Sequence, residues 1–309
     1  MNQIWRLLCL SKLQLSWHLL TLVVLIMAAP SQAADKALLI GVDRYPQLPQ
    51  RLWLRGPSND VTLMRSALLQ QGFAEAHIQT LVDAPSRAQI LAAMQAMLAH
   101  TTPGDRLLFY FAGHGSQQPQ PAGRLPVEPD GLDEVLLPAD VAAWDGHGSQ
   151  ASIAHAIVDD EIGAWIDALV DRGAVVWALF DTCHAAGMTR STSTGYERAI
   201  HPHELGLKLS GASAKTAPRQ SRGRQDGRVL LFAGRSHERV REEWMPRGAN
   251  LAQARMHGVF TWHVASLLPE LGMKDPEALL AAVRQRYEQE QRSQPLPMLS
   301  GALANTGKH

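Results

Sequence analysis

The chain has 309 residues, of which 46% are hydrophobic and 19% are charged, so it is long enough to bury a substantial core. Lys and Arg together number 29, as do Asp and Glu, so no net charge favours nucleic-acid binding. The same composition excludes an intrinsically disordered chain.

Residues 1–33 have the pattern of a secretory signal peptide. Two basic residues precede an apolar run at about 19–29, and small residues follow up to Ala33. The run is shorter than the roughly 20 apolar residues that a membrane-spanning helix needs. We therefore expect cleavage after Ala33 or Ala34 and export across the inner membrane, to a bacterial periplasm or the outside of a cell. No stable membrane association is expected afterwards.

Hydrophobic patterning then predicts an alternation of strands and helices. Short apolar runs that end in turn residues predict strands at 36–45, 77–83, 105–113, 174–182 and 229–236. Apolar residues at helical spacing predict helices at 61–73, 86–100, 159–170, 258–271 and 275–293, with N-terminal caps expected at Ser58-Asn59-Asp60 and at Ser86. The alternation predicts an α/β fold with a mostly parallel central sheet covered by helices.

The stretch 190–227 interrupts this alternation. It is rich in Ser, Thr, Gly and Arg and has little apolar periodicity. We interpret it as a long exposed loop.

The pentapeptide GHGSQ occurs twice, around His114 and around His147. His114 lies between Gly113 and Gly115, directly after an apolar strand, and ligands of open α/β sheets bind beyond the carboxyl ends of the strands. His147 lies in a polar segment with no strand before it. We therefore interpret His114 as the functional copy and His147 as a solvated loop residue.

The chain has two cysteines, Cys9 in the predicted leader and Cys183. After removal of the leader, Cys183 would be a single thiol with no disulfide partner. Like His114, it follows the end of an apolar strand. A cysteine and a histidine at one sheet edge indicate nucleophilic catalysis: a thiolate attacks, an imidazole transfers protons, and small neighbours let backbone N–H groups approach an oxyanion.

A set of longer motifs now carries a family resemblance. In order along the chain they are LLIGVDRY, LRGPSNDVTLM, LLFYFAGHGSQ, DGLDEVLLPAD, IVDDEI and VVWALFDTCHAAG. With them the chain resembles the caspase-like cysteine peptidases of family C14, and specifically a bacterial member of the metacaspase branch. The resemblance implies a three-layer caspase-like sandwich over 34–302, with a larger part at 34–189, a variable basic loop at 190–227, a smaller part at 228–302, and a C-terminal tail at 303–309.

The resemblance also implies a catalytic dyad. Cys183 would form a thioester with the substrate acyl group, and His114 would protonate the leaving amine. The backbone N–H groups of Cys183 and Gly115 would form the oxyanion hole. No cofactor is required for this chemistry.

Two aspartates suggest the substrate specificity. Asp181 stands two residues before the nucleophile, where caspases that cut after aspartate carry glutamine, and Asp60 matches the second acidic position of metacaspases. Two carboxylates in one pocket would attract a guanidinium and reject a carboxylate. We expect protein or peptide substrates cut after Arg, with Lys tolerated. Asp60 could instead be a helix cap or first-turn residue.

Calcium is the one cation that the resemblance suggests, as an activator. Asp133, Asp159 and Asp160 match acidic segments that hold calcium in many metacaspases, and calcium needs several oxygen ligands. A further carboxylate is expected seven positions after the nucleophile, where this chain has Arg190. Asp159 and Asp160 could equally stabilise a helix N-terminus without metal, so both interpretations stay open.

The loop 190–227 also raises the question of self-processing. Its basic residues are Arg190, Arg198, Lys208, Lys215, Arg219, Arg222 and Arg224. An enzyme that cuts after basic residues could cleave itself there, and the alternative is a flexible basic linker.

Two other functions stay open for the whole chain: a caspase-fold scaffold or regulatory binding module with little peptidase activity, and a Cys/His hydrolase of non-peptide amides.

Overall fold

The computed structural model describes residues 33–123, 130–147, 151–183, 196–209, 227–235 and 238–302. The chain divides into two compact units, Met1–Ala33 and Ala34–His309, and only the second is described below. The predicted signal peptide lies outside the described residues, apart from its last position. Within the ranges just given, no helix has the length and apolar character needed to cross a membrane.

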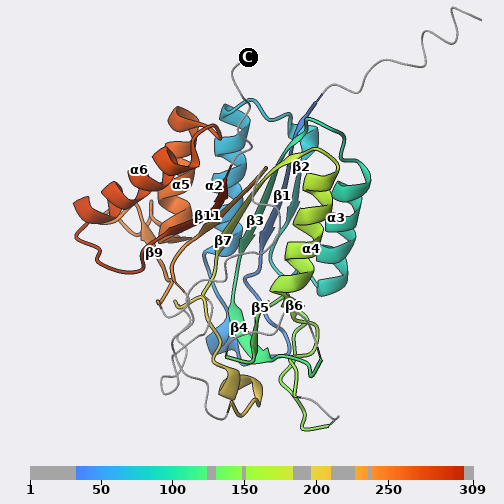
Figure 1. Ribbon diagram of the computed structural model, residues 1–309. Coiled ribbons are helices and arrows are strands. Elements are labelled where there is room, and N and C mark those ends of the chain that lie inside the picture. The colour runs from blue at the N-terminus through green and yellow to red at the C-terminus, as the bar shows by residue number, and fades with distance from the viewer. Residues whose placement is uncertain are drawn as a thin grey trace, which may run out of the picture. The chain divides into compact units, whose positions relative to one another are not determined.

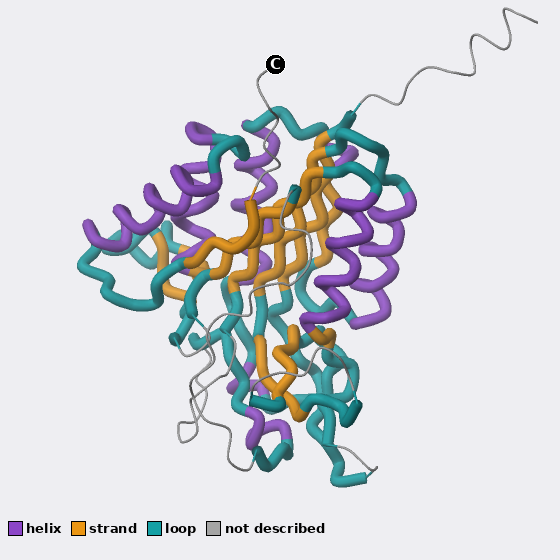
Figure 2. Tube along the Cα trace, in the orientation of Figure 1, coloured by secondary structure: helices purple, strands orange, loops and turns teal. Residues whose placement is uncertain are grey.

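A six-stranded sheet forms the centre of the unit, in the order β11-β8-β7-β3-β1-β2. Its strands are β1 (Asp35–Gly41), β2 (Ile78–Leu81), β3 (Arg106–Ala112), β7 (Val175–Asp181), β8 (Arg228–Phe232) and β11 (Met298–Ala302). All neighbouring strands are parallel except β11, which runs antiparallel to β8. The strands lie side by side between helices (Figure 2). This confirms the predicted, mostly parallel sheet.

Helices cover both faces of this sheet. They are α2 (Pro57–Gln70), α3 (Arg87–Ala99), α4 (Asp159–Asp171), α5 (Val259–Leu271) and α6 (Pro276–Gln289). Helices α3 and α4 lie on one face, and α2, α5 and α6 lie on the other (Figure 1). The three layers confirm the predicted fold class.

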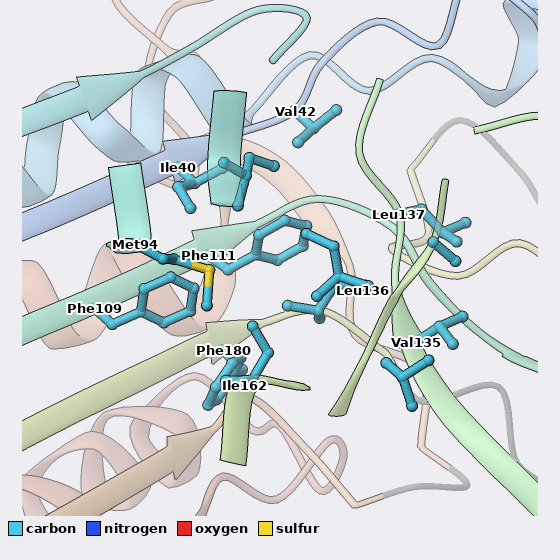
Figure 3. Packing of buried hydrophobic residues seen from close by; sticks show 14 of the residues in the cluster. Ile40, Val42, Met94, Phe109, Phe111, Val135, Leu136, Leu137, Ile162 and Phe180 are labelled. Carbon is cyan, nitrogen blue, oxygen red and sulfur yellow. The ribbon is translucent and has the colours of Figure 1, made fainter. Parts of the chain in front are cut away.

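Alternate residues of the central strands pack into two separate hydrophobic cores, one on each face of the sheet. Phe109 and Phe111 pack on the α3/α4 side with Met94 and Ile162 (Figure 3), whereas Leu108 and Tyr110 pack on the α2/α5/α6 side. Because both faces are covered, β3 is buried along nearly its whole length. This explains why its sequence is continuously apolar rather than alternating.

Among the residues that the structure describes, two small sheets and three short 3₁₀ helices complete the unit. One sheet contains β4 (Gly115–Pro119), β5 (Leu132–Leu136) and β6 (Ile157–Val158), and the other contains β9 (Glu242–Met245) and β10 (Arg255–Gly258). The 3₁₀ helices are η1 (Gln50–Leu52), η2 (Glu75–His77) and η3 (Pro202–Leu205). The small sheets were not predicted, because strands such as Gly115–Pro119 are polar and lack an apolar period.

The two predicted helix caps had different outcomes. Ser86 caps α3 and forms a capping box with Gln89, as expected. The expected cap at Ser58-Asn59-Asp60 is wrong, because α2 begins earlier, at Pro57, with Gly56 as its N-cap. Proline is favoured at the first helical position, so Asp60 lies inside the first turn.

The prediction that 190–227 is exposed is wrong for many of the residues that the structure describes there. Ile200, Leu205 and Leu207 are fully or almost fully buried and belong to the core on the α3/α4 side. Arg198 is also fully buried. The apolar residues are too few and too irregularly spaced to show a period, yet backbone hydrogen bonds to several strand ends hold the segment in place.

Candidate active site

The two predicted catalytic side chains follow neighbouring strands. Strands β3 and β7 are parallel, with Ala112 beside Asp181, so His114 and Cys183 each stand two residues beyond a strand end at the same sheet edge. Both residues are buried. The other GHGSQ histidine, His147, is exposed in a loop and belongs to no strand, as predicted.

The imidazole of His114 is oriented by two neighbours. Its Nε2 lies 2.5 Å from the carbonyl oxygen of Leu52, and its ring lies 5.0 Å from that of Tyr45. A carbonyl only accepts, so Nε2 carries the proton and Nδ1 keeps a lone pair. Nδ1 has no hydrogen-bond partner within the described chain. Burial lowers the pKa of His114 to about 4, so the ring is neutral at pH 7 and Nδ1 can accept a proton.

The thiol of Cys183 contacts the backbone of Val240. Its Sγ accepts the Val240 N–H at 2.9 Å and donates to the Val240 carbonyl at 3.4 Å. Burial raises the pKa of Cys183 to about 12, so the thiol is protonated at neutral pH. The described hydrogen bonds of Cys183 and His114 do not join the two side chains, so the structure shows an uncharged pair at rest.

Two backbone N–H groups beside the thiol converge on one carbonyl oxygen. The N–H groups of Cys183 and Gly115 donate to the carbonyl of Arg198, at 3.0 and 3.1 Å. A Cβ at Gly115 would lie 2.8 Å from Oγ1 of Thr182 and would also collide with the Cys183 carbonyl, so only glycine permits this approach. These are the two donors that the resemblance implies for an oxyanion hole.

The side chain of Arg198 occupies a pocket of three carboxylates. Its Nη1 lies 3.0 Å from Oδ2 of Asp181, its Nη2 binds Oδ2 of Asp60, and Nη2 lies 3.7 Å from Oε2 of Glu242. None of the four side chains is exposed. Both predicted specificity residues therefore meet in one pocket, and a residue of the chain itself fills it.

Groups other than Arg198 hold each carboxylate in place. Asp60 accepts hydrogen bonds from Nδ1 of His257 at 2.9 Å and from the N–H of Gly258 at 3.1 Å. Asp181 accepts from the hydroxyl of Thr261 at 2.5 Å and from its N–H at 3.1 Å. These donors would remain if the guanidinium left, so the pocket is preorganised for a cation.

Glu242 is held in the same manner and completes the pocket. It accepts the N–H groups of Arg55 and Gly56 at 2.8 and 2.9 Å. Burial raises the pKa of Glu242 to about 7, although Arg198 opposes the shift. Burial also raises the pKa of Asp181, again against the effect of Arg198. In turn, burial alone would lower the pKa of Arg198, but the surrounding carboxylates raise it well above its ordinary value.

Two glycines give the pocket its space. A Cβ at Gly258 would lie 2.7 Å from Nη1 of Arg198, and a Cβ at Gly56 would lie 3.1 Å from Nη2. Side chains at either position would therefore intrude on a bound guanidinium. Sequence analysis named Arg198 only as one of the basic residues of 190–227 and did not identify Glu242 or these glycines, because no local pattern connects segments so far apart along the chain.

The predicted calcium ligands lie on β5 and at the start of α4, which directly follows β6, the partner of β5. Asp133 is buried in β5, and Asp159 and Asp160 begin α4. Across the described ranges, no three acidic, histidine or cysteine side chains gather closely enough to hold a metal ion. Arg190, which stands where a further carboxylate was expected seven positions after the nucleophile, lies outside those ranges. Calcium activation therefore stays a prediction, and no step is derived through calcium.

Comparison with known proteins places this site in a family context. A family model described as "Metacaspase, peptidase C14 domain" matches residues 35–191. Metacaspase-1A of Aspergillus niger is 37% identical over 158 residues, covering 48% of this chain and 35% of that protein. Metacaspase-1 of Candida albicans is 34% identical over 163 residues, covering 50% and 33%. The chain thus spans about a third of the length of these curated relatives.

A solved structure supports the fold. The crystal structure of protein GSU0716 from Geobacter sulfurreducens matches with a TM-score of 0.58 and 20% sequence identity, over 88% of this chain and 94% of that one. The family match contains His114, Cys183 and both pocket aspartates. Arg198 and Glu242 lie beyond it.

Proposed function

Because the chain belongs to the metacaspase family of C14 peptidases, we propose that it is a cysteine endopeptidase that cleaves proteins or peptides after arginine, and less rapidly after lysine. One observation carries the proposal: Arg198 of the chain itself binds beside Cys183 in the manner that we propose for the arginine of a substrate. Its guanidinium is among three carboxylates, and its carbonyl oxygen is between two N–H groups beside the cysteine.

The charge of the pocket supports the preference for a basic residue. Asp60, Asp181 and Glu242 present three carboxylates to one bound side chain, so an aspartate there would add a fourth acidic group with no cation to balance it. A guanidinium is planar and can bind two of these carboxylates at once. A lysine ammonium is a point charge and would use fewer of the contacts.

The two catalytic side chains would act in sequence. Nδ1 of His114 takes the proton of the Cys183 thiol, and Sγ attacks the carbonyl carbon of the substrate arginine. The N–H groups of Cys183 and Gly115 stabilise the resulting oxyanion. His114 then gives its proton to the leaving amine, and water hydrolyses the thioester. The thiol must first turn from Val240 toward His114.

We also infer that the enzyme acts outside the cytoplasm, in a bacterial periplasm or beyond. The support is the sequence of residues 1–33, with basic residues, an apolar run and small residues in the order of an export signal. N-terminal sequencing of the secreted protein would test this inference. A mature chain that still begins at Met1 would contradict it.

Matched peptides that differ only in the residue before the cut would test the proposed activity. We expect the leaderless protein to cleave the arginine peptide fastest, and Cys183→Ala to lower kcat/KM by about 1,000-fold or more. His114→Ala should have a similar effect, whereas His147→Ala, the change in the exposed GHGSQ copy, should have none. Fastest cleavage after aspartate would refute the specificity. Parallel assays with calcium and with chelator would test the predicted calcium activation.

A further inference from the structure

A cavity of about 370 Å³ lies where the stretch before β9 meets α5 and α6 (Figure 1). This volume is within the range of sites that bind small molecules. Among the residues that line the cavity, three are arginines, Arg239, Arg241 and Arg292, whereas one is acidic, Glu243. The lining therefore carries two positive charges in excess.

The cavity is distinct from the pocket of Arg198. Successive side chains of a strand point to opposite faces, so Glu243 lies across β9 from Glu242, which faces Arg198. Val240 lines the cavity and also contacts Cys183, and it does so through backbone hydrogen bonds. A ligand in the cavity would therefore not occupy the place of a substrate arginine.

Arg292 forms one wall of the cavity, and its charge is already balanced. Its Nη1 and Nη2 bind the carboxylate of Glu243 at 2.9 and 2.7 Å, and its Nε binds Oε2 of Glu290 at 2.6 Å. Because two carboxylates surround this one guanidinium, Arg292 has little attraction left for an anion.

Arg241 supplies the charge that is most available to a ligand. It is exposed and forms no ion pair within the described ranges. Arg239 lies two residues away along the chain, and its side chain is 43% exposed. Nε of Arg239 lies 3.5 Å from Oε1 of Glu197, which is longer than an ordinary hydrogen bond. An anion entering the cavity would face both guanidiniums and would compete with the carboxylate of Glu197.

The remaining lining is apolar and contains one hydroxyl without an acceptor. Val259, Phe260 and Pro295 supply apolar surface. Tyr287 is 1% exposed, and its hydroxyl has no hydrogen-bond partner among the described residues. Burial raises the pKa of Tyr287 well above its ordinary value, so the hydroxyl stays protonated and able to donate. A buried donor without an acceptor costs stability, which an acceptor oxygen of a ligand would recover.

From these features we propose that the cavity binds a small organic phosphate, with its phosphate group at Arg239 and Arg241 and its organic body against the apolar lining. A phosphate monoester carries about −1.5 to −2 charge near pH 7 and has three acceptor oxygens, which match two guanidiniums and the hydroxyl of Tyr287. A carboxylate would balance only one of the two charges. This site goes beyond the proposed function and does not depend on it, because no catalytic side chain contributes to it.

Calorimetric titration of the leaderless Cys183→Ala chain with phenyl phosphate would test the site in the absence of peptidase activity. We expect saturable binding, at least about tenfold tighter than that of inorganic phosphate, because only the ester can bury a ring. Arg241→Gln should weaken binding by at least about tenfold, since it removes a charge-assisted pair. Tyr287→Phe should weaken it by about threefold or more, since it removes only the donor. Arg172→Gln, at the exposed C-cap of α4 on the other face of the sheet, should leave the affinity unchanged.

Glu197→Gln should have the opposite effect to these losses. It removes the carboxylate that competes for Arg239, so phenyl phosphate should bind at least about threefold more tightly. An unchanged midpoint of thermal unfolding without ligand would show that each variant is folded.

Absence of saturable binding, or equal affinity in Arg241→Gln and Arg172→Gln, would overturn the site. Equal affinity for inorganic phosphate and phenyl phosphate would overturn the organic ligand. Both outcomes would leave the proposed peptidase intact. Failure of the wild type to cleave arginine peptides would instead refute the proposed function and leave this site standing.

Discussion

Two arginines are bound by carboxylates from adjacent residues of β9, yet the two sites differ in character. Glu242 faces the buried pocket of Arg198, whereas Glu243 accepts two hydrogen bonds from Arg292, at 2.9 and 2.7 Å. Successive side chains of a strand point to opposite faces, which places the two sites on opposite sides of β9. Arg198 is completely buried, but Glu243 is 35% exposed in its pair with Arg292.

This difference separates a binding pocket from a structural ion pair. Both described hydrogen bonds of Glu243 come from Arg292, so this carboxylate depends on its arginine. The carboxylates around Arg198 are also held by backbone N–H groups, by Thr261 and by His257. The proposed function requires the pocket to exchange Arg198 for the arginine of a substrate, and these contacts favour that exchange because they do not involve the guanidinium.

The largest expected effect comes from filling the Arg198 pocket. Gly258→Ala should lower kcat/KM for arginine peptides by at least about 100-fold, because the added Cβ would collide with the carboxylate of Asp181 and would also enter the space of the guanidinium. Gly163→Ala is the matched control: it lies inside α4 with open space around it and should leave activity unchanged. Arg292→Ala should change kcat/KM by less than about threefold. A decrease in kcat/KM as large as that of Gly258→Ala would contradict the distinction between the Arg198 pocket and the Glu243–Arg292 ion pair.

The second effect is a pH dependence of stability at Glu242. Its pKa is raised from an ordinary value of 4.5 to about 7, so its contribution is fully present below pH 4.5 and is lost as pH rises through about 7. Relative to Glu242→Gln, the wild type should lose about 3 kcal/mol of unfolding free energy over this window. Denaturant unfolding at pH 5 and pH 8 would measure it. Parallel pH profiles of the two proteins would contradict the assignment.

The smallest effect has the opposite sign and belongs to Glu243. The hydrogen bonds from Arg292 lower the pKa of Glu243, so its stabilising contribution is present above its ordinary value of 4.5 and is lost as pH falls below it. Because the carboxylate is about one-third exposed, we expect no more than about 1 kcal/mol. Comparing Glu243→Gln with wild type at pH 3.5 and pH 7 would detect a difference only at the higher pH.

Sequence patterns were sufficient for the five parallel strands of the central sheet, the helices and the two catalytic candidates, whereas the antiparallel edge strand β11 was not predicted. Continuous apolar strands such as β3 and β7 can be recognised from their sequence alone. The residues that follow the ends of such parallel strands lie at the same edge of the sheet. His114 and Cys183 could therefore be placed together before any coordinates were known.

The occupant of the pocket could not be predicted in this way. The pair between Asp60 and Arg198 joins residues 138 positions apart, and Arg198 lies in a stretch with no apolar period. Burial of such a residue depends on partners from α2, β7 and β9 together, which no local pattern encodes. The aperiodic composition of 190–227 predicted an exposed loop, but Arg198 and Ile200 are buried there, and long-range hydrogen bonds hold their backbone in place.

Burial of Cys183 also bears on the chemical lifetime of the protein. Alkylating reagents and oxidants attack the thiolate, and this thiol is both enclosed and held in its protonated form. A resting chain should therefore persist unmodified in surroundings that would oxidise an exposed catalytic thiol. Sensitivity to oxidation would begin only when the cleft opens, so the same event that makes the enzyme competent would also limit how long it stays active.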